Sequence, residues 1–123
     1  MESRFSNDFL AAIVCACAWK PKPVLNLCAA LCLLALEEQD FTAADLPDDL
    51  TRDDIHLPGI AVGKLIQAGV LHVVGRTKSP DKKAHGRKLD VLRMTSRQLC
   101  VSWLARNGFS TAIPYPKGEP VLL

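Results

Sequence analysis

Positive charge is concentrated in one short segment of the chain, residues 76–88, which read RTKSPDKKAHGRK. Six of these thirteen positions are Lys or Arg and one is His. Cations at this density can neutralise several phosphate groups of a nucleic acid and release the counterions condensed on it. The candidate phosphate-binding residues of the segment are Arg76, Lys78, Lys82, Lys83, His85, Arg87 and Lys88. For His85 a second role stays open, which is to shape the turn of the chain.

The formal charge of the whole chain, +2, conceals an uneven distribution. Residues 37–54 hold eight acidic side chains and one Arg, a formal charge of −7. Residues 64–106 hold ten basic and two acidic side chains, a formal charge of +8. Such an arrangement in a small protein predicts one face that attracts polyanions and one that repels them. The alternative is a solvated surface without a partner, since Lys and Arg are mostly exposed in any protein.

The length and composition predict a single globular domain over residues 1–123. A chain of 123 residues is long enough for one hydrophobic core and too short for two domains. Hydrophobic residues make up 49% of the chain and charged residues 23%, which is typical of a folded protein and not of a disordered one.

Two apolar runs near the start of the chain, residues 9–19 and 24–36, raise the question of a membrane or secretion segment. The second run is too short to span a bilayer, and two Lys and two Pro residues separate it from the first. The first run lacks the net positive flank of a secretion signal, because Glu2 and Asp8 offset Arg4. We therefore expect a cytoplasmic protein that does not insert into a membrane.

Five Cys residues, an odd number, lie at positions 15, 17, 28, 32 and 100. Four of them are embedded in apolar runs, and their spacing is not that of a zinc finger. We interpret them as free, buried thiols in a reducing compartment. The sequence therefore predicts no metal site and no cofactor.

Start and stop signals divide the first half of the chain into helices. Residues 6–19 open with Ser, Asn and Asp, which favour a helix start. Residues 23–39 begin with Pro and are apolar nearly all round, as expected of a buried central helix. Thr42 and Asp45 have the spacing of a capping box and predict a short helix that ends near residue 47.

A further helix is predicted over residues 58–68, between Pro58 and Gly69. Its pattern predicts a core face formed by Ile60, Val62, Leu65, Ile66 and Ala68. The opposite, exposed face would then hold Gly59, Gly63, Lys64 and Gln67.

The pattern changes after Gly69 to two short β-prone segments, residues 70–76 and 88–94, which predict a hairpin with positive φ at Gly75 and Gly86. His72 is expected to pack within the first strand. A last helix, residues 96–107, follows a second capping-box pattern that starts at Thr95, and residues 108–123 are expected to be extended. The core face predicted for the last helix is Leu99, Cys100, Trp103 and Leu104.

This order of elements resembles the winged helix-turn-helix superfamily. The resemblance is carried by "DFTAADL" at residues 40–46, "GIAVGKLIQAGVLHVVG" at 59–75 and "GRKLDVLRM" at 86–94. It covers about residues 24–94 and is similar to small wing-bearing proteins of bacteria and their phages. The predicted fold is thus mostly α-helical with a small β-hairpin (α+β), a winged helix-turn-helix with extra N- and C-terminal helices at 6–19 and 96–107.

The resemblance implies binding of double-stranded DNA. In such folds the third helix enters the major groove, and the wing contacts the sugar–phosphate backbone or the minor groove. Here the helix 58–68 offers only Lys64 and Gln67 for this purpose, whereas the wing is strongly basic. We expect phosphate-dominated binding of modest sequence specificity, in a transcriptional regulator or an accessory factor of DNA transactions.

Two other interpretations are weighed against this one. Winged-helix domains also serve as protein–protein assembly modules, and the acidic residues 37–54 and the poor helix 58–68 suit that role. The flanking helices could form a homodimer interface in either case. An enzyme is not expected, because the three His residues are scattered and the acidic run 48–54 lacks the Gly-centred pattern of a calcium loop.

Overall fold

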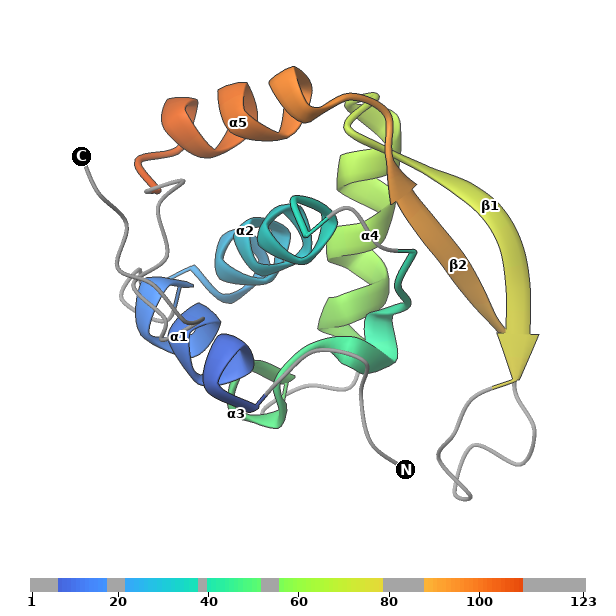
Figure 1. Ribbon diagram of the computed structural model, residues 1–123, viewed down its shortest axis with the longest axis horizontal. Helices are drawn as coiled ribbons and strands as arrows, with labels where there is room; N and C mark the ends of the chain where they lie inside the picture. Colours follow the sequence, from blue (N-terminus) through green and yellow to red (C-terminus); the bar gives the residue numbers. More distant parts are fainter. Residues whose placement is uncertain (1–6, 18–21, 38–39, 52–55, 79–87, 110–123) are drawn as a thin grey trace.

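The computed structural model of the chain describes residues 7–17, 22–37, 40–51, 56–78 and 88–109. These residues form a mostly helical α+β structure with one antiparallel hairpin that follows the third of its longer helices (Figure 1). The helical elements are α1 (Asn7–Cys17), α2 (Pro23–Ala35), the 3₁₀ turn η1 (Ala43–Asp45), α3 (Asp48–Thr51), α4 (Leu57–Gln67) and α5 (Arg97–Arg106). The strands are β1 (Leu71–Lys78) and β2 (Lys88–Met94).

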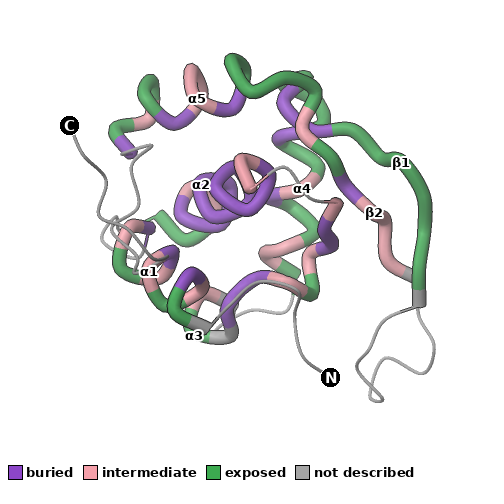
Figure 2. The backbone as a smooth tube through the Cα atoms, viewed as in Figure 1, coloured by how far each residue is buried: buried purple, intermediate pink, exposed green. Residues whose placement is uncertain are grey.

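Helix α2 is the centre of the core, as predicted. Pro23 opens it, and every residue of 26–35 is buried, so that the helix is enclosed by α1, α4 and α5 (Figures 1 and 2). It ends at Ala35, four residues before the predicted end at 39. The chain turns there because Phe41 must reach β2, where Phe41 and Leu92 exchange two backbone hydrogen bonds of 3.1 and 2.7 Å.

The capping box predicted at Thr42 is confirmed. The Thr42 hydroxyl accepts a hydrogen bond from the backbone N–H of Ala44 at 3.2 Å, and the Thr42 N–H donates to the Asp45 carboxylate at 2.9 Å. The element that it opens is a single 3₁₀ turn. A separate turn, α3, follows within the acidic segment.

The hairpin is confirmed, and its register is interrupted once. Leu71 pairs with Met94 and Val73 with Leu92, but the next pair is Gly75 with Val91, so Val74 is the extra residue of a bulge. Gly75 is not at positive φ, because the bulge accommodates the change in direction that we had assigned to its backbone. Gly86 lies outside the described residues.

Among the described residues two glycines adopt the left-handed conformation, and both end helices. Gly69 follows α4 with a φ of 78°, and Gly108 follows α5 with a φ of 81°. Only glycine adopts this conformation without steric cost, which explains why the chain leaves each helix at that point. Both stop signals were correctly predicted from the sequence.

The N-cap of α5 is Ser96, one residue later than the predicted cap, Thr95, and the helix begins at Arg97. The hydroxyl of Ser96, not of Thr95, accepts a hydrogen bond from the backbone N–H of Leu99 at 3.2 Å. The predicted core face is confirmed for Cys100 and Leu104, which are buried, but Leu99 is 39% exposed. Partly buried Trp103 stacks on the ring of Phe109 with ring centroids 6.2 Å apart.

Two further findings concern the apolar helices and the Cys residues. In the part of the chain that the structure describes, no helix has both the length and the apolarity needed to cross a membrane. All five Cys residues are free thiols, and four of them are buried, whereas Cys15 is exposed on α1.

Candidate nucleic-acid interface

The hairpin extends away from the helices as a two-stranded projection (Figure 1). Its described strands carry three of the predicted phosphate-binding residues, Arg76, Lys78 and Lys88. The other four, Lys82, Lys83, His85 and Arg87, belong to residues 79–87, which lie outside the described residues. The two paired strands therefore bring both ends of the basic segment together on the same projection.

The register places like charges opposite each other at the far end of the described strands. Lys78 on β1 pairs with Lys88 on β2.

One predicted cation, Arg76, already has an anionic neighbour. Its guanidinium lies 3.2 Å from the carboxylate of Asp90, the residue opposite it in the register. The two side chains are 71% and 42% exposed, and an ion pair so exposed contributes little to stability. Arg76 is thus directed along the hairpin surface and remains accessible to solvent, with part of its charge compensated.

Helix α4 presents a different face from the predicted one. Ala61 and Leu65 are buried, whereas Ile60 and Ile66, which we had assigned to the core, are 47% and 37% exposed. Ala68, also assigned to the core, is exposed as well. The reason is a close crossing of α4 over α2, in which the Cys28 thiol lies 3.6 Å from the carbonyl oxygen of Ala61. A small residue fits at that crossing and a large one does not.

Lys64 and Gln67 are exposed on α4, as predicted. Lys64 lies on the edge of this face that is nearer to α2. Burial raises the pKa of the Cys28 thiol on α2 to about 11, and the positive charge of Lys64 opposes part of that rise. The Lys64 ammonium is therefore close enough to α2 to act on it while remaining in solvent.

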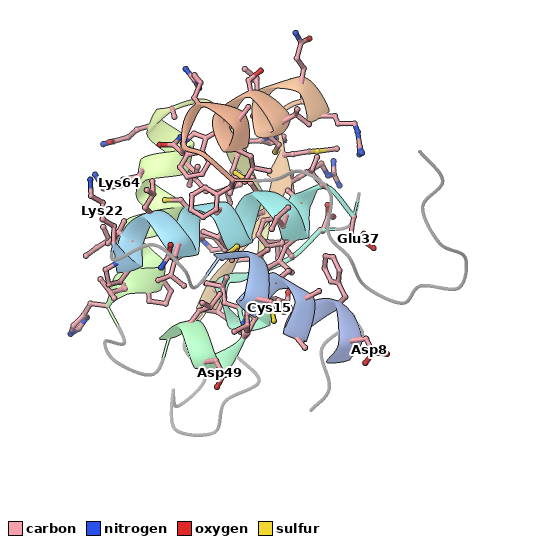
Figure 3. All side chains as sticks on the ribbon, turned by 90° about the vertical axis from the view of Figure 1, so that its left-hand side faces the viewer. Asp8, Cys15, Lys22, Glu37, Asp49 and Lys64 are labelled. Atoms are coloured by element: carbon pink, nitrogen blue, oxygen red, sulfur yellow. The ribbon has the colours of Figure 1, made fainter. Side chains whose placement is uncertain are left out.

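Lys22 is a candidate that the sequence reasoning did not select. It is the exposed residue that precedes α2, and it lies at the same edge of the molecule as Lys64 in the view of Figure 3. The partial positive charge of a helix N-terminus adds to that of a side chain at this position. The signal in the sequence is the Lys-Pro pair at residues 22 and 23, immediately before an apolar helix. The labelled Glu37 and Asp8 lie at the opposite edge (Figure 3).

Arg93 is one of the ten basic residues counted in residues 64–106, but its contacts stabilise the fold. Its guanidinium makes two hydrogen bonds to the carboxylate of Asp40, at 2.7 and 3.0 Å. These bonds and the negative charge of Asp40 raise the pKa of Arg93 above its ordinary value. The pair ties the base of the hairpin to the segment after α2. One positive and one negative charge are thereby removed from the two predicted faces.

His72 is exposed on β1 and is not packed within the strand, contrary to the prediction. Its Nδ1 atom lies 3.5 Å from the hydroxyl of Thr95. His72 follows buried Leu71 within β1, and successive side chains of a strand point to opposite faces, which accounts for the difference.

Three of the four buried thiols, those of Cys17, Cys28 and Cys32, have a raised pKa, whereas a hydrogen bond with Cys32 lowers the pKa of the Cys100 thiol. Burial raises the pKa of the Cys17 thiol to about 12, and a hydrogen bond with Cys100 together with burial raises that of Cys32. A thiol with a raised pKa is a poor nucleophile, since the thiolate is the reactive form. Within the described ranges no group of three or more His, Cys, Asp or Glu residues is placed to hold a metal ion.

Comparison of the chain with protein-family models, with curated proteins and with solved structures finds no match.

Proposed function

We propose that this chain is a winged helix-turn-helix protein that binds double-stranded DNA, with the basic hairpin as the wing and α4 as the helix in the major groove. It would act as a transcriptional regulator or as an accessory factor in a DNA transaction. Binding would rest mainly on phosphate contacts of residues 76–88, with Lys64 and Gln67 contributing from α4.

The observation that carries this proposal is the bridge between Phe41 and Leu92. It adds the short segment after α2 to β2, on the side away from β1. The resulting order is α2, a single-residue strand, two short turns, α4 and a hairpin, and α4 runs into β1 through Gly69. This is the order of elements on which the resemblance to the winged helix-turn-helix superfamily rests.

The electrostatics support DNA as the partner. Each phosphate contact made by a Lys or Arg releases condensed counterions, a gain that an exposed ion pair within the protein does not provide. The paired positions of Lys78 and Lys88, together with exposed Lys64 and Lys22, supply cations from three separate elements. Few of the residues on α4 can make base-specific hydrogen bonds, so hydrogen bonds to base edges would contribute little to sequence specificity.

A second function, a winged-helix assembly module that binds protein, is favoured by one observation. Val73 and Val74 on β1 are 43% and 37% exposed, next to each other at the bulge. Two adjacent exposed β-branched side chains on a projecting strand are suited to contact with another protein surface. The acidic residues that follow α2 could then meet the basic hairpin of a partner molecule.

Titration of a labelled duplex with the full chain, at several salt concentrations, separates the two functions. For DNA binding we expect log K to fall linearly with log salt, and the variant with Lys82, Lys83, Arg87 and Lys88 changed to Glu to lose binding. Retained helicity with no duplex binding at low salt would rule out the DNA function and favour the assembly module.

A matched pair of variants controls for net charge. K82Q/K83Q and R97Q/R106Q each remove two positive charges, the first from the hairpin and the second from α5. The hairpin variant should lower the slope of the salt dependence by about two. The α5 variant should leave it close to that of the parent chain, and equal effects of the two would mean that only net charge matters.

A further inference from the structure

The exposed face of α4 contains an apolar side chain between two polar ones. Successive residues of an α-helix are about 100° apart, so Lys64 and Gln67 lie about 40° and about 20° from Ile60 around the axis. Ile60 lies in the first turn of α4 and is 47% exposed. The first turn of a helix that enters the major groove is the part that contacts base edges.

The same face has two glycines that the fold itself does not require. A Cβ added to Gly59 or Gly63 would meet no atom within 4 Å, and neither residue has positive φ. Each glycine weakens the helix by about 1 kcal/mol relative to alanine. Beside Ile60 they leave the helix backbone bare, which lets an external surface approach it closely. The glycines make the surface of this face shallow, whereas Ile60, Lys64 and Gln67 provide the side chains that can contact a ligand.

Resting on the proposed function, we propose that Ile60 is a specificity-determining residue that contacts the C5-methyl groups of thymine in the major groove. Thymine is the base that presents an apolar group there, and apolar side chains recognise it by contact with that methyl group. This contact selects A·T pairs.

The neighbouring charge argues for DNA and against an apolar protein surface as the occupant of this face. A protein surface that buried Ile60 would also desolvate the ammonium of Lys64 one turn further along, which is unfavourable without an anionic partner. A major groove places methyl groups on its floor and phosphates on its rim, so that both side chains are satisfied at once.

Replacement of thymine by deoxyuridine tests the proposal, because it removes the methyl group and leaves charge and base pairing unchanged. A duplex library with a random core is first selected for binding to the full chain. The enriched duplex is then made with thymine and with uracil, and binding is measured by fluorescence polarisation. We expect enrichment of thymine at fixed positions, and uracil at a contacted position to weaken binding about fourfold, the effect of one buried methyl group.

Two variants with the same loss of volume identify the side chain responsible. Ile60→Ala should bind the thymine duplex about as weakly as the parent chain binds the uracil duplex, and it should no longer distinguish the two. Ile66 is also exposed but lies about 120° from Ile60 around the helix. Ile66→Ala should therefore keep the full difference between thymine and uracil.

The outcomes separate this inference from the proposed function. Salt-dependent binding with no thymine enrichment, or with equal affinity for thymine and uracil duplexes, overturns the role of Ile60 and leaves the DNA function standing. A uracil effect that persists in Ile60→Ala also overturns it. Absence of binding to any duplex at low salt overturns the DNA function itself. A uracil effect that Ile60→Ala abolishes and Ile66→Ala preserves supports the inference.

Discussion

Helices α2 and α4 differ in how far packing in the core accounts for their amino-acid sequences. The side chains of α2 from residue 26 to 35 are all buried, and those from residue 27 on are all apolar, so packing explains them. Helix α4 buries Ala61 and Leu65 and exposes two Ile and two Gly, a choice that neither packing nor helix propensity explains. The comparison teaches that α2 builds the fold, whereas the outer face of α4 is suited to contact with another molecule.

The largest expected effect concerns the loss of apolar volume from each helix. Leu31→Ala in α2, where the side chain is fully buried, should lower the free energy of unfolding by about 2–5 kcal/mol. Ile60→Ala in α4 should change it by less than about 0.5 kcal/mol, because the side chain is already in contact with solvent. Urea denaturation measures both. If Ile60→Ala lowered the free energy of unfolding as much as Leu31→Ala does, Ile60 would belong to the core and the two helices would not differ in this respect.

A second expected effect contrasts a buried with an exposed thiol on α1. Folding raises the pKa of the Cys17 thiol from 9.0 to about 12. Between these values the unfolded chain has lost a proton that the folded chain keeps. The free energy of unfolding therefore falls as the pH rises, by at most about 1.4 kcal/mol per pH unit for one thiol.

The measurement is urea denaturation under reducing conditions at about pH 8 and about pH 10, on either side of the ordinary thiol pKa. Cys17→Ala should lose less stability between the two pH values than the parent chain does. Cys15→Ala, two residues away and exposed, should behave like the parent. Identical pH dependence in the two variants would mean that burial of Cys17 does not control this part of the stability.

The smallest expected effect distinguishes glycines that the fold needs from those that it does not. Gly63→Ala should stabilise the chain by about 0.5–1 kcal/mol, because the added methyl group meets no atom within 4 Å. Gly69→Ala should destabilise it by about 1 kcal/mol, since Gly69 has a φ of 78°. Thermal denaturation reports both signs. If Gly63→Ala is more stable than the parent chain but binds duplex DNA less tightly, the exposed backbone at Gly63 contributes to binding. An unchanged DNA affinity would mean that Gly63 is not part of the interface.

The parts of the fold that local chemistry decides were predictable. The capping box at Thr42, the glycine stops at residues 69 and 108, and the nearly all-apolar α2 each follow from short-range rules. The buried face of α4 did not, because two alternative faces were similarly apolar. Side-chain size at the crossing with α2 decided between them, and that depends on the tertiary contact of Ala61 with Cys28.

The candidate site was predictable in composition and less so in arrangement. The basic segment was evident from charge alone, but the neutralisation of Arg76 by Asp90 depends on strand register. Register in turn depends on the bulge at Val74, for which the sequence has no signal beyond Gly75. Lys22 was missed because its role requires α2 and α4 to be placed side by side.

The attachment of the hairpin at its base has a mechanical consequence. Asp40 and Phe41 are adjacent, and each binds β2, the first through Arg93 and the second through Leu92. These two consecutive residues therefore help to fix the angle between the hairpin and the central helix α2. One residue inserted just before Asp40 would leave every cation in the chain unchanged but would alter this angle, and the proposed function then predicts weaker binding to duplex DNA.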